Sequence, residues 1–146
     1  MSGAECVPAL RVTLPAHRDS LPLLRHVLRG FRDAYVIAPA TMDDIVLAVS
    51  EAATNVVLHA YPSRTGSLTL VANMRDGRLH VVIRDHGSGI VPPDDTPRPG
   101  RGLALMEHVS ASLEILGGPA GTDVLMTFDL SADHDGTTLG DFGVDR

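Results

Sequence analysis

The sequence has no lysine and no tryptophan, one cysteine (Cys6) and only 3% aromatic residues. Without lysine, the chain cannot form a Walker A phosphate loop, a lysine Schiff base, a Ser-Lys dyad or the nucleotide site of a conventional protein kinase. Because few aromatic side chains are present to stack on bases, a base-stacking nucleic-acid module is disfavoured. These absences remove several enzyme and binding classes before any motif is considered.

Charge and hydropathy narrow the remaining classes. Twelve arginines against eighteen acidic residues give a formal net charge of −6, which disfavours binding to a phosphate backbone. One cysteine cannot form an internal disulfide, no signal segment follows Met1, and no apolar run approaches the ~18 residues of a membrane span. With 146 residues, 44% of them hydrophobic, we expect one soluble cytoplasmic domain without direct contact to nucleic acid or membrane.

Hydrophobic periodicity places this domain at residues 9–130, between an N-terminal tail (1–8) and an acidic C-terminal tail (131–146). The strands expected from the pattern are 9–14, 67–74, 78–84, 113–116 and 123–130. The expected helices are 20–35, 42–60 and 103–112.

Capping and turn residues indicate where these elements begin and end. Thr41 followed by Asp44 is expected to cap the start of the longest helix. Asp76-Gly77 is a strong hairpin signal between two strand-like runs. Because most strands are consecutive and joined by hairpins, we predict an α+β fold. It is a two-layer α/β sandwich in which a mixed, mostly antiparallel sheet carries the helices on one face.

Three polar residues of the longest helix, Glu51, Asn55 and His59, follow at intervals of four and therefore share one side of it. Most of the remaining helix surface is apolar, so part of that side must border buried surface, where a carboxylate and an amide need partners. Two interpretations stay open. The side is the solvated face of an amphipathic helix, or Glu51 is a general base and the Asn55 carbonyl oxygen binds Mg²⁺.

Two glycine-bearing segments supply further candidates. Asp85-His86-Gly87-Ser88-Gly89-Ile90 follows an apolar strand, where its carboxylate can accept a hydrogen bond from a ligand amino group. Gly100-Arg101-Gly102-Leu103 leads into a helix whose free N–H groups can bind phosphate oxygens. Taken alone, the first is also typical of a turn and the second of a hinge. Gly121-Thr122, with Thr127 on the last strand, is a weaker signal.

In this order, the segments resemble the ATP-binding fold of the gyrase, Hsp90, histidine-kinase and MutL (GHKL) superfamily. The similarity is greatest to its anti-sigma-factor serine/threonine kinase branch. The match covers residues 41–130, where the long helix resembles the family's N box and the segments beginning at Asp85 and Gly100 resemble its two glycine boxes. The segment from Gly121-Thr122 to Thr127 resembles the family's closing strand, and four ordered segments are far more specific than one. The resemblance implies a Bergerat-type ATP-binding fold with ATP and Mg²⁺ as cofactors.

The resemblance also implies a role for individual residues at the adenine end. Asp85 would receive the adenine amino group, Ile90 would line the base pocket, and Thr127 would support the neighbouring water network. The nucleotide-binding residues implied in this way are Asn55, Asp85, Gly87, Gly89, Ile90, Gly100, Arg101, Gly102, Leu103 and Thr127.

At the phosphate end, Asn55 would hold Mg²⁺ while residues 100–103 wrap the phosphates. Glu51 would activate the hydroxyl of a partner's Ser or Thr, and Arg101 would approach the γ-phosphate. This arrangement needs no lysine, because phosphoryl transfer depends mainly on positioning and charge neutralisation.

The function implied is that of a kinase which phosphorylates a small antagonist protein and binds a sigma factor, with homodimerisation also implied. Two alternatives stay open. One is a non-catalytic ATP-binding module whose nucleotide only controls partner binding, and the other is a standalone ATPase that uses water as acceptor. An arginine stripe, Arg25, Arg29 and Arg32, would suit an acidic partner such as a sigma factor, although a solvated face is the commoner explanation of such a stripe.

Overall fold

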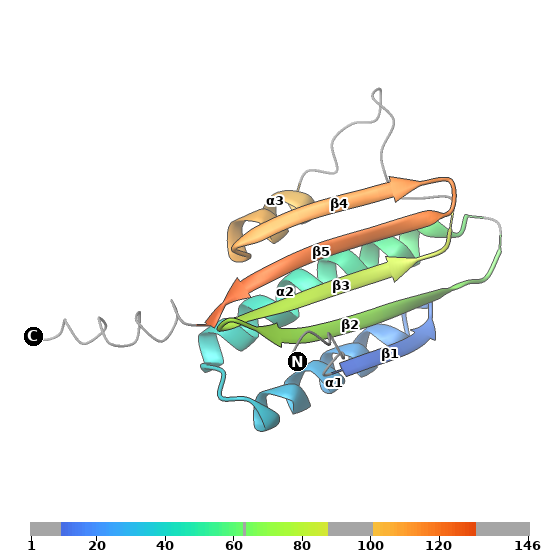
Figure 1. The fold of residues 1–146 in the computed structure, drawn as a ribbon. Coiled ribbons are helices and arrows are strands. Elements are labelled where there is room, and N and C mark those ends of the chain that lie inside the picture. Colours follow the sequence, from blue (N-terminus) through green and yellow to red (C-terminus); the bar gives the residue numbers. More distant parts are fainter. Residues whose placement is uncertain (1–9, 63, 88–100, 131–146) are drawn as a thin grey trace, which may run out of the picture.

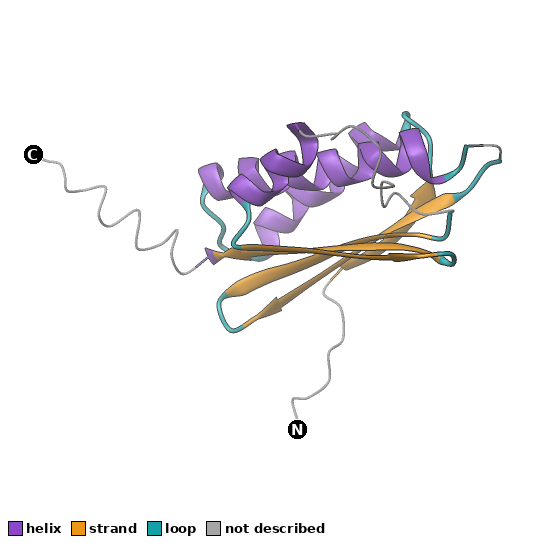
Figure 2. Ribbon diagram, turned by 90° about the horizontal axis from the view of Figure 1, so that it is seen from above, coloured by secondary structure: helices purple, strands orange, loops and turns teal. Residues whose placement is uncertain are grey.

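The computed structural model describes residues 10–62, 64–87 and 101–130, without the side chains of residues 101 and 102. Within this part of the chain, five strands form one sheet and three α-helices pack on it. Figure 1 shows the strands side by side in front of the helices. Figure 2, turned by 90°, shows the helices (purple) on a single side of the sheet (orange). This is the two-layer α+β architecture predicted from the sequence.

The sheet has the strand order β1-β2-β3-β5-β4, and each described pairing is antiparallel. Its strands are β1 (Leu10–Pro15), β2 (Ser67–Arg75), β3 (Arg78–Asp85), β4 (Ser112–Gly118) and β5 (Gly121–Asp129). Because the last strand inserts between β3 and β4, β3 is the central strand and β4 becomes an edge. Any side chain at the end of β3 is therefore flanked by strands on both sides.

The β2–β3 hairpin forms as its sequence predicts. Asp76 and Gly77 have φ values of 56° and 75°, and two positive values in succession are what a type I′ turn requires. The turn fixes the register of the two strands, which pairs Leu68 with Asp85 at their far ends.

The helices are α1 (Ser20–Ala34), α2 (Pro39–Asn55) and α3 (Arg101–Val109), and α2 continues directly into a short π-helix, η1 (Val56–Ala60). The single long helix expected over 42–60 is thus present, but its last five residues are wound more widely. None of the described helices is both long and apolar enough to span a membrane.

The predicted capping pair at the start of α2 is wrong. The helix begins at Pro39, with Ala38 as its N-cap and no side-chain cap, and Thr41 is buried as the third residue of its first turn. Proline explains the difference, because its fixed φ suits the first helical turn and it has no N–H group to leave unsatisfied. Thr41 and Asp44 are therefore helix residues rather than caps.

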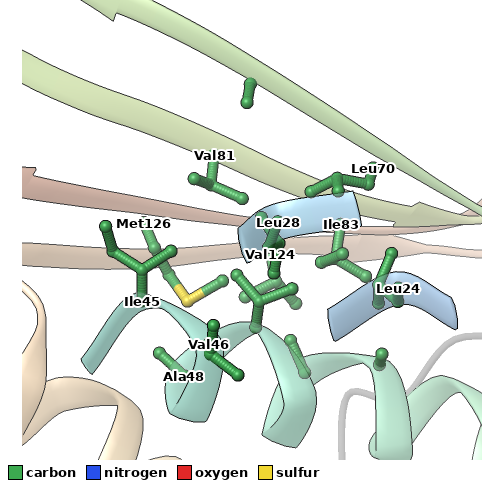
Figure 3. Close-up of a cluster of buried hydrophobic side chains, with 14 of the residues drawn as sticks. Leu24, Leu28, Ile45, Val46, Ala48, Leu70, Val81, Ile83, Val124 and Met126 are labelled. Carbon is green, nitrogen blue, oxygen red and sulfur yellow. The ribbon is translucent and has the colours of Figure 1, made fainter. Parts of the chain in front are cut away.

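The core lies between the helices and the inner face of the sheet. Figure 3 shows Leu24 and Leu28 of α1 and Ile45, Val46 and Ala48 of α2 close to Leu70, Val81, Ile83, Val124 and Met126 of the strands. Along β3, alternate residues are buried, and this period of two continues to the last residue of the strand. As a result, Asp85 lies on the same inner face as the apolar Val81 and Ile83.

Truncating a side chain on this inner face should cost far more than truncating one at the sheet edge. Leu70 of β2 is 0% exposed, whereas Leu116 of β4 is 52% exposed. We expect Leu70→Ala to lower the free energy of unfolding by about 2–5 kcal/mol and Leu116→Ala by at most about 0.5 kcal/mol. Urea denaturation of both variants measures the difference, and equal losses would contradict the assigned register.

Candidate functional site

The centre of the candidate site is Asp85, which is only 1% exposed at the end of β3. The Gly87 N–H donates a hydrogen bond to Asp85 Oδ1 at 2.9 Å. Asp85 Oδ2 is buried and accepts no hydrogen bond from the described residues. Burial raises the pKa of this carboxyl, and the backbone N–H groups of Gly87 and Thr122 offset that rise only in part. A buried acceptor without a donor is costly, so this atom suits a ligand that brings an N–H group.

Two glycines allow the backbone to close around this carboxylate. A Cβ at Gly87 would lie 2.0 Å from the carbonyl oxygen of Ala60, at the end of η1. A Cβ at Gly121, where φ is +135°, would lie 2.1 Å from the carbonyl oxygen of Asp85. Only glycine permits both approaches. The near neighbour of Gly87 is thus the end of the protein's own helix η1.

The expected role of Thr127 at the adenine end is not compatible with its position. Thr127 pairs with His80 in the middle of the sheet, and its hydroxyl lies 2.7 Å from the hydroxyl of Ser112 on the exposed side. Thr122 instead pairs directly with Asp85 and is 2% exposed. Residues of opposite parity on a strand face opposite ways, so Thr127 cannot share the inner face with Thr122. Thr122, rather than Thr127, is therefore the threonine of β5 that lies beside Asp85 on the inner face.

Glu51 and Asn55 lie one turn apart near the C-terminal end of α2, and both are half-buried. From Asn55, η1 leads to Ala60, which touches Gly87, so the end of α2 and the end of β3 belong to the same end of the molecule. His59 is exposed in η1, where the wider π-helical turn breaks the interval of four that relates it to Asn55. Of the three polar residues predicted to share one side of this helix, only Glu51 and Asn55 do so.

The phosphate-binding candidates begin α3, as expected, but two residues earlier than predicted. Arg101 is its first residue, and Leu103 is partly buried against the core. Outside the described residues lie Gly89, Ile90, Gly100 and the two predicted tails, 1–8 and 131–146. The side chain of Arg101 and the surroundings of Gly102 are likewise outside the described part.

A separate hollow lies at the other end of the sheet. It has a volume of about 500 Å³ and is lined by Arg75, Asp76, Arg78 and His80. Burial, and then the charges of the two arginines, lower the pKa of His80. Asp85 stands at the opposite end of β3, five residues and about 17 Å beyond His80 at ~3.3 Å per residue. The hollow is therefore not part of the site around Asp85.

Alanine at position 87 should disturb the junction between η1 and β3. The new Cβ would meet backbone rather than a movable side chain, so we expect Gly87→Ala to cost about 1–3 kcal/mol of unfolding free energy. Gly30 in α1 is the matched control, because a Cβ there meets nothing within 4 Å and alanine favours helix by about 1 kcal/mol. Thermal or urea unfolding should show opposite signs for the two variants; a harmless Gly87→Ala would refute the close approach.

The raised pKa of Asp85 predicts a pH-dependent contribution to stability. A folded-state pKa above the unfolded value of about 3.9 stabilises the fold fully below that value, and this stabilisation is lost as pH rises through the folded pKa. The Asp85→Asn variant has no titratable group at this position. Relative to that variant, the nucleotide-free wild type should lose stability as pH rises from about 4 until the carboxyl is ionised. Urea denaturation across this range tests the sign, and parallel profiles would contradict it.

Comparison with known proteins places this geometry in a family. The family model for the histidine kinase-like ATPase domain matches residues 14–128. The serine-protein kinase RsbW of Bacillus mycoides (strain KBAB4) is 27% identical over 133 residues, covering 81% of this chain and 82% of the relative. RsbW of Bacillus cereus (strain ATCC 10987 / NRS 248) is 26% identical over the same shares.

Two solved structures with similar folds also carry the names RsbW and histidine kinase. The RsbU and RsbW domains of Rv1364c from Mycobacterium tuberculosis superpose with a TM-score of 0.69 at 27% identity, over 85% of this chain and 33% of that chain. The blue-light activated histidine kinase EL346 of Erythrobacter litoralis gives 0.60 at 27% identity, over 68% of this chain and 33% of that chain. This chain thus spans about a third of either solved protein. Because the family model matches most of its length, the protein belongs to the histidine kinase-like ATPase domain family.

Proposed function

We propose that this protein binds ATP with Mg²⁺ and transfers the γ-phosphoryl group to a Ser or Thr of a small antagonist protein, as part of a switch that controls a sigma factor. The proposal rests on one observation. Asp85 Oδ2 is buried and accepts no hydrogen bond from the described residues, and Asp85 pairs with Thr122 on the neighbouring strand. Membership of the ATPase family and similarity to relatives named serine-protein kinases support it.

At the adenine end, the chemistry of the site matches the edge of the base. The exocyclic amino group of adenine is an N–H donor, and Asp85 Oδ2 is a buried acceptor that needs one. The ionised carboxylate is the better acceptor, and the Gly87 N–H already holds its other oxygen. Guanine carries a carbonyl oxygen at the equivalent position, which this carboxylate would repel. The site therefore favours adenine over guanine.

At the phosphate end, Asn55 offers an amide oxygen of the kind that Mg²⁺ accepts, at the end of α2. When bound, Mg²⁺ would supply charge neutralisation on the phosphates. The start of α3 supplies free backbone N–H groups, and Arg101 supplies a positive charge in a chain without lysine. Residues 100–103 are proposed to enclose the phosphates, as the resemblance to the second glycine box implies.

Glu51 is proposed as the general base, one helical turn before Asn55. In the reaction, the acceptor hydroxyl gives its proton to the Glu51 carboxylate as its oxygen forms a bond to the γ-phosphorus. The bond between that phosphorus and the β–γ bridging oxygen breaks, and ADP leaves. A half-buried carboxylate is still reached by another protein's side chain, which a protein kinase requires.

Partner binding is proposed to involve the arginines of α1 and a second copy of this chain. Arg29 and Arg32 are exposed, and Arg25 is partly buried. Arg29 lies 3.5 Å from Asp43, but an ion pair this exposed contributes little, so it would exchange readily for an acidic partner. The site geometry is equally compatible with a non-catalytic module in which ATP only controls partner binding.

Removing the proposed base separates these functions. Glu51→Gln should lower phosphate transfer from labelled ATP to a cognate antagonist by at least about 100-fold, because general-base catalysis contributes that much. ATP affinity measured by calorimetry should stay unchanged, since the adenine and phosphate contacts remain. Glu114→Gln is the matched control, because Glu114 is exposed on edge strand β4.

Full transfer by Glu51→Gln would refute the assigned base. A wild type that forms ATP-dependent complexes but transfers no phosphate would establish the non-catalytic alternative. Turnover of ATP by the isolated protein would identify a standalone ATPase.

A further inference from the structure

The loop between η1 and β2 contains one tyrosine, Tyr61, whose hydroxyl joins three segments. It donates a hydrogen bond to the carbonyl oxygen of Ser67 at 2.6 Å, at the start of β2. It also accepts one from the N–H of His86 at 2.8 Å, directly after β3. The hydroxyl thus uses both its donor and an acceptor position, and it ties the end of η1 to two neighbouring strands.

Arg64 holds the other polar backbone group of His86. Its Nη2 donates to the carbonyl oxygen of His86 at 3.2 Å, and its guanidinium lies 5.3 Å from the centre of the Tyr61 ring. That distance is within the range of a cation–π contact, so the two side chains support each other. Both backbone groups of His86 are therefore held by side chains, just where the ladder of β3 has ended.

These contacts reach Asp85 through planar peptide units. The carbonyl oxygen of His86 and the N–H of Gly87 belong to one rigid peptide plane, so the bond from Arg64 orients the N–H that Asp85 Oδ1 accepts. The N–H of His86 shares its plane with the carbonyl oxygen of Asp85, so Tyr61 fixes that plane as well. Rotation of the plane between His86 and Gly87 would carry the Gly87 N–H away from Oδ1 and release the carboxylate from its orientation.

Gly66 shows that the ring position is specific. A Cβ at Gly66 would lie 2.1 Å from Cε1 of the Tyr61 ring, so the ring occupies space that only glycine leaves open. Gly66 leaves room for the Tyr61 ring, and the Tyr61 hydroxyl has two hydrogen-bond partners. Tyr61 is therefore held in one position by its surroundings, unlike a side chain that lies loosely on the surface.

We propose that Tyr61, assisted by Arg64, is a positioning residue that orients the Asp85 carboxylate for adenine, an inference that rests on the nucleotide site proposed above. Neither side chain need touch the nucleotide. Their effect is to hold the peptide planes on either side of His86, so that Oδ1 stays bound to the Gly87 N–H and Oδ2 stays available. Selectivity for adenine then depends on a phenol outside the base pocket.

The Tyr61→Phe variant tests the positioning role, because it removes only the hydroxyl oxygen that makes both hydrogen bonds. ATP should bind about tenfold more weakly, the size of one lost hydrogen bond, while the ratio of ATP to GTP affinity falls. In the transfer assay, KM for ATP should rise with kcat unchanged. The matched control is Tyr35→Phe. It removes the same oxygen from a ring that packs at a tilt against Phe31 of α1, with 4.8 Å between the ring centroids, and it should leave all three values unaltered.

Hydrogen exchange of the His86 amide tests the contact without nucleotide. In the wild type this amide is bonded to Tyr61, so it should exchange about tenfold more slowly than in Tyr61→Phe. Arg64→Ala should weaken ATP binding in the same direction, and it changes an exposed side chain.

The outcomes separate this inference from the proposed function. If the wild type binds no ATP, the proposed function fails, and amide exchange alone decides whether Tyr61 holds His86. If the wild type binds ATP and Tyr61→Phe keeps both its affinity and its ATP/GTP ratio, the positioning role is overturned. A lower melting temperature with an unchanged ratio would likewise overturn it, because a purely structural residue would behave in that way.

Discussion

A carboxylate held on the apolar inner face of the central strand is the constraint on which the rest of this molecule depends. Asp85 continues the inward series of β3, where Val81 and Ile83 meet the core. Desolvating such a group is unfavourable, and the backbone N–H groups of Gly87 and Thr122 offset this only in part, while Oδ2 accepts no hydrogen bond from the described residues. Asp85 Oδ2 therefore keeps unmet hydrogen-bonding capacity at the end of β3, which is a common basis for a binding site.

The surrounding structure keeps that carboxylate in one orientation. Gly87 and Gly121 let η1 and β5 approach to distances that no side chain permits. Tyr61 fills the space beside Gly66 and bonds the backbone of His86. These close contacts join segments far apart in the sequence, and they make the end of β3 the meeting point of a helix end and the sheet. Just beyond the last ladder pair of β3, at His86 and Gly87, these contacts hold the backbone where the ladder no longer does.

Much of the fold was predictable because its signals are local. The hairpin follows from Asp76-Gly77, which adopt the positive φ values that their types favour. The helices follow from apolar periodicity, and the error at the start of α2 arose because Thr41 resembles a cap while Pro39 supplies a better start. Within the site, Asp85, Gly87, Glu51 and Asn55 were found by motif. The sequence pointed to Thr127 where the structure has Thr122, because the register in which β5 pairs with β3 cannot be predicted from β5 alone.

The amino-acid sequence by itself determined the elements, the absence of lysine-based chemistry and the acidic residue that ends β3, because composition, periodicity and turn preference act within a few neighbouring residues. Only the tertiary structure decided that β5 lies beside β3, that Thr122 adjoins Asp85, and that Tyr61 holds His86. The physical reason is that strand order, register and hydrogen bonds between distant segments are fixed jointly by burial of the core, which no local pattern encodes.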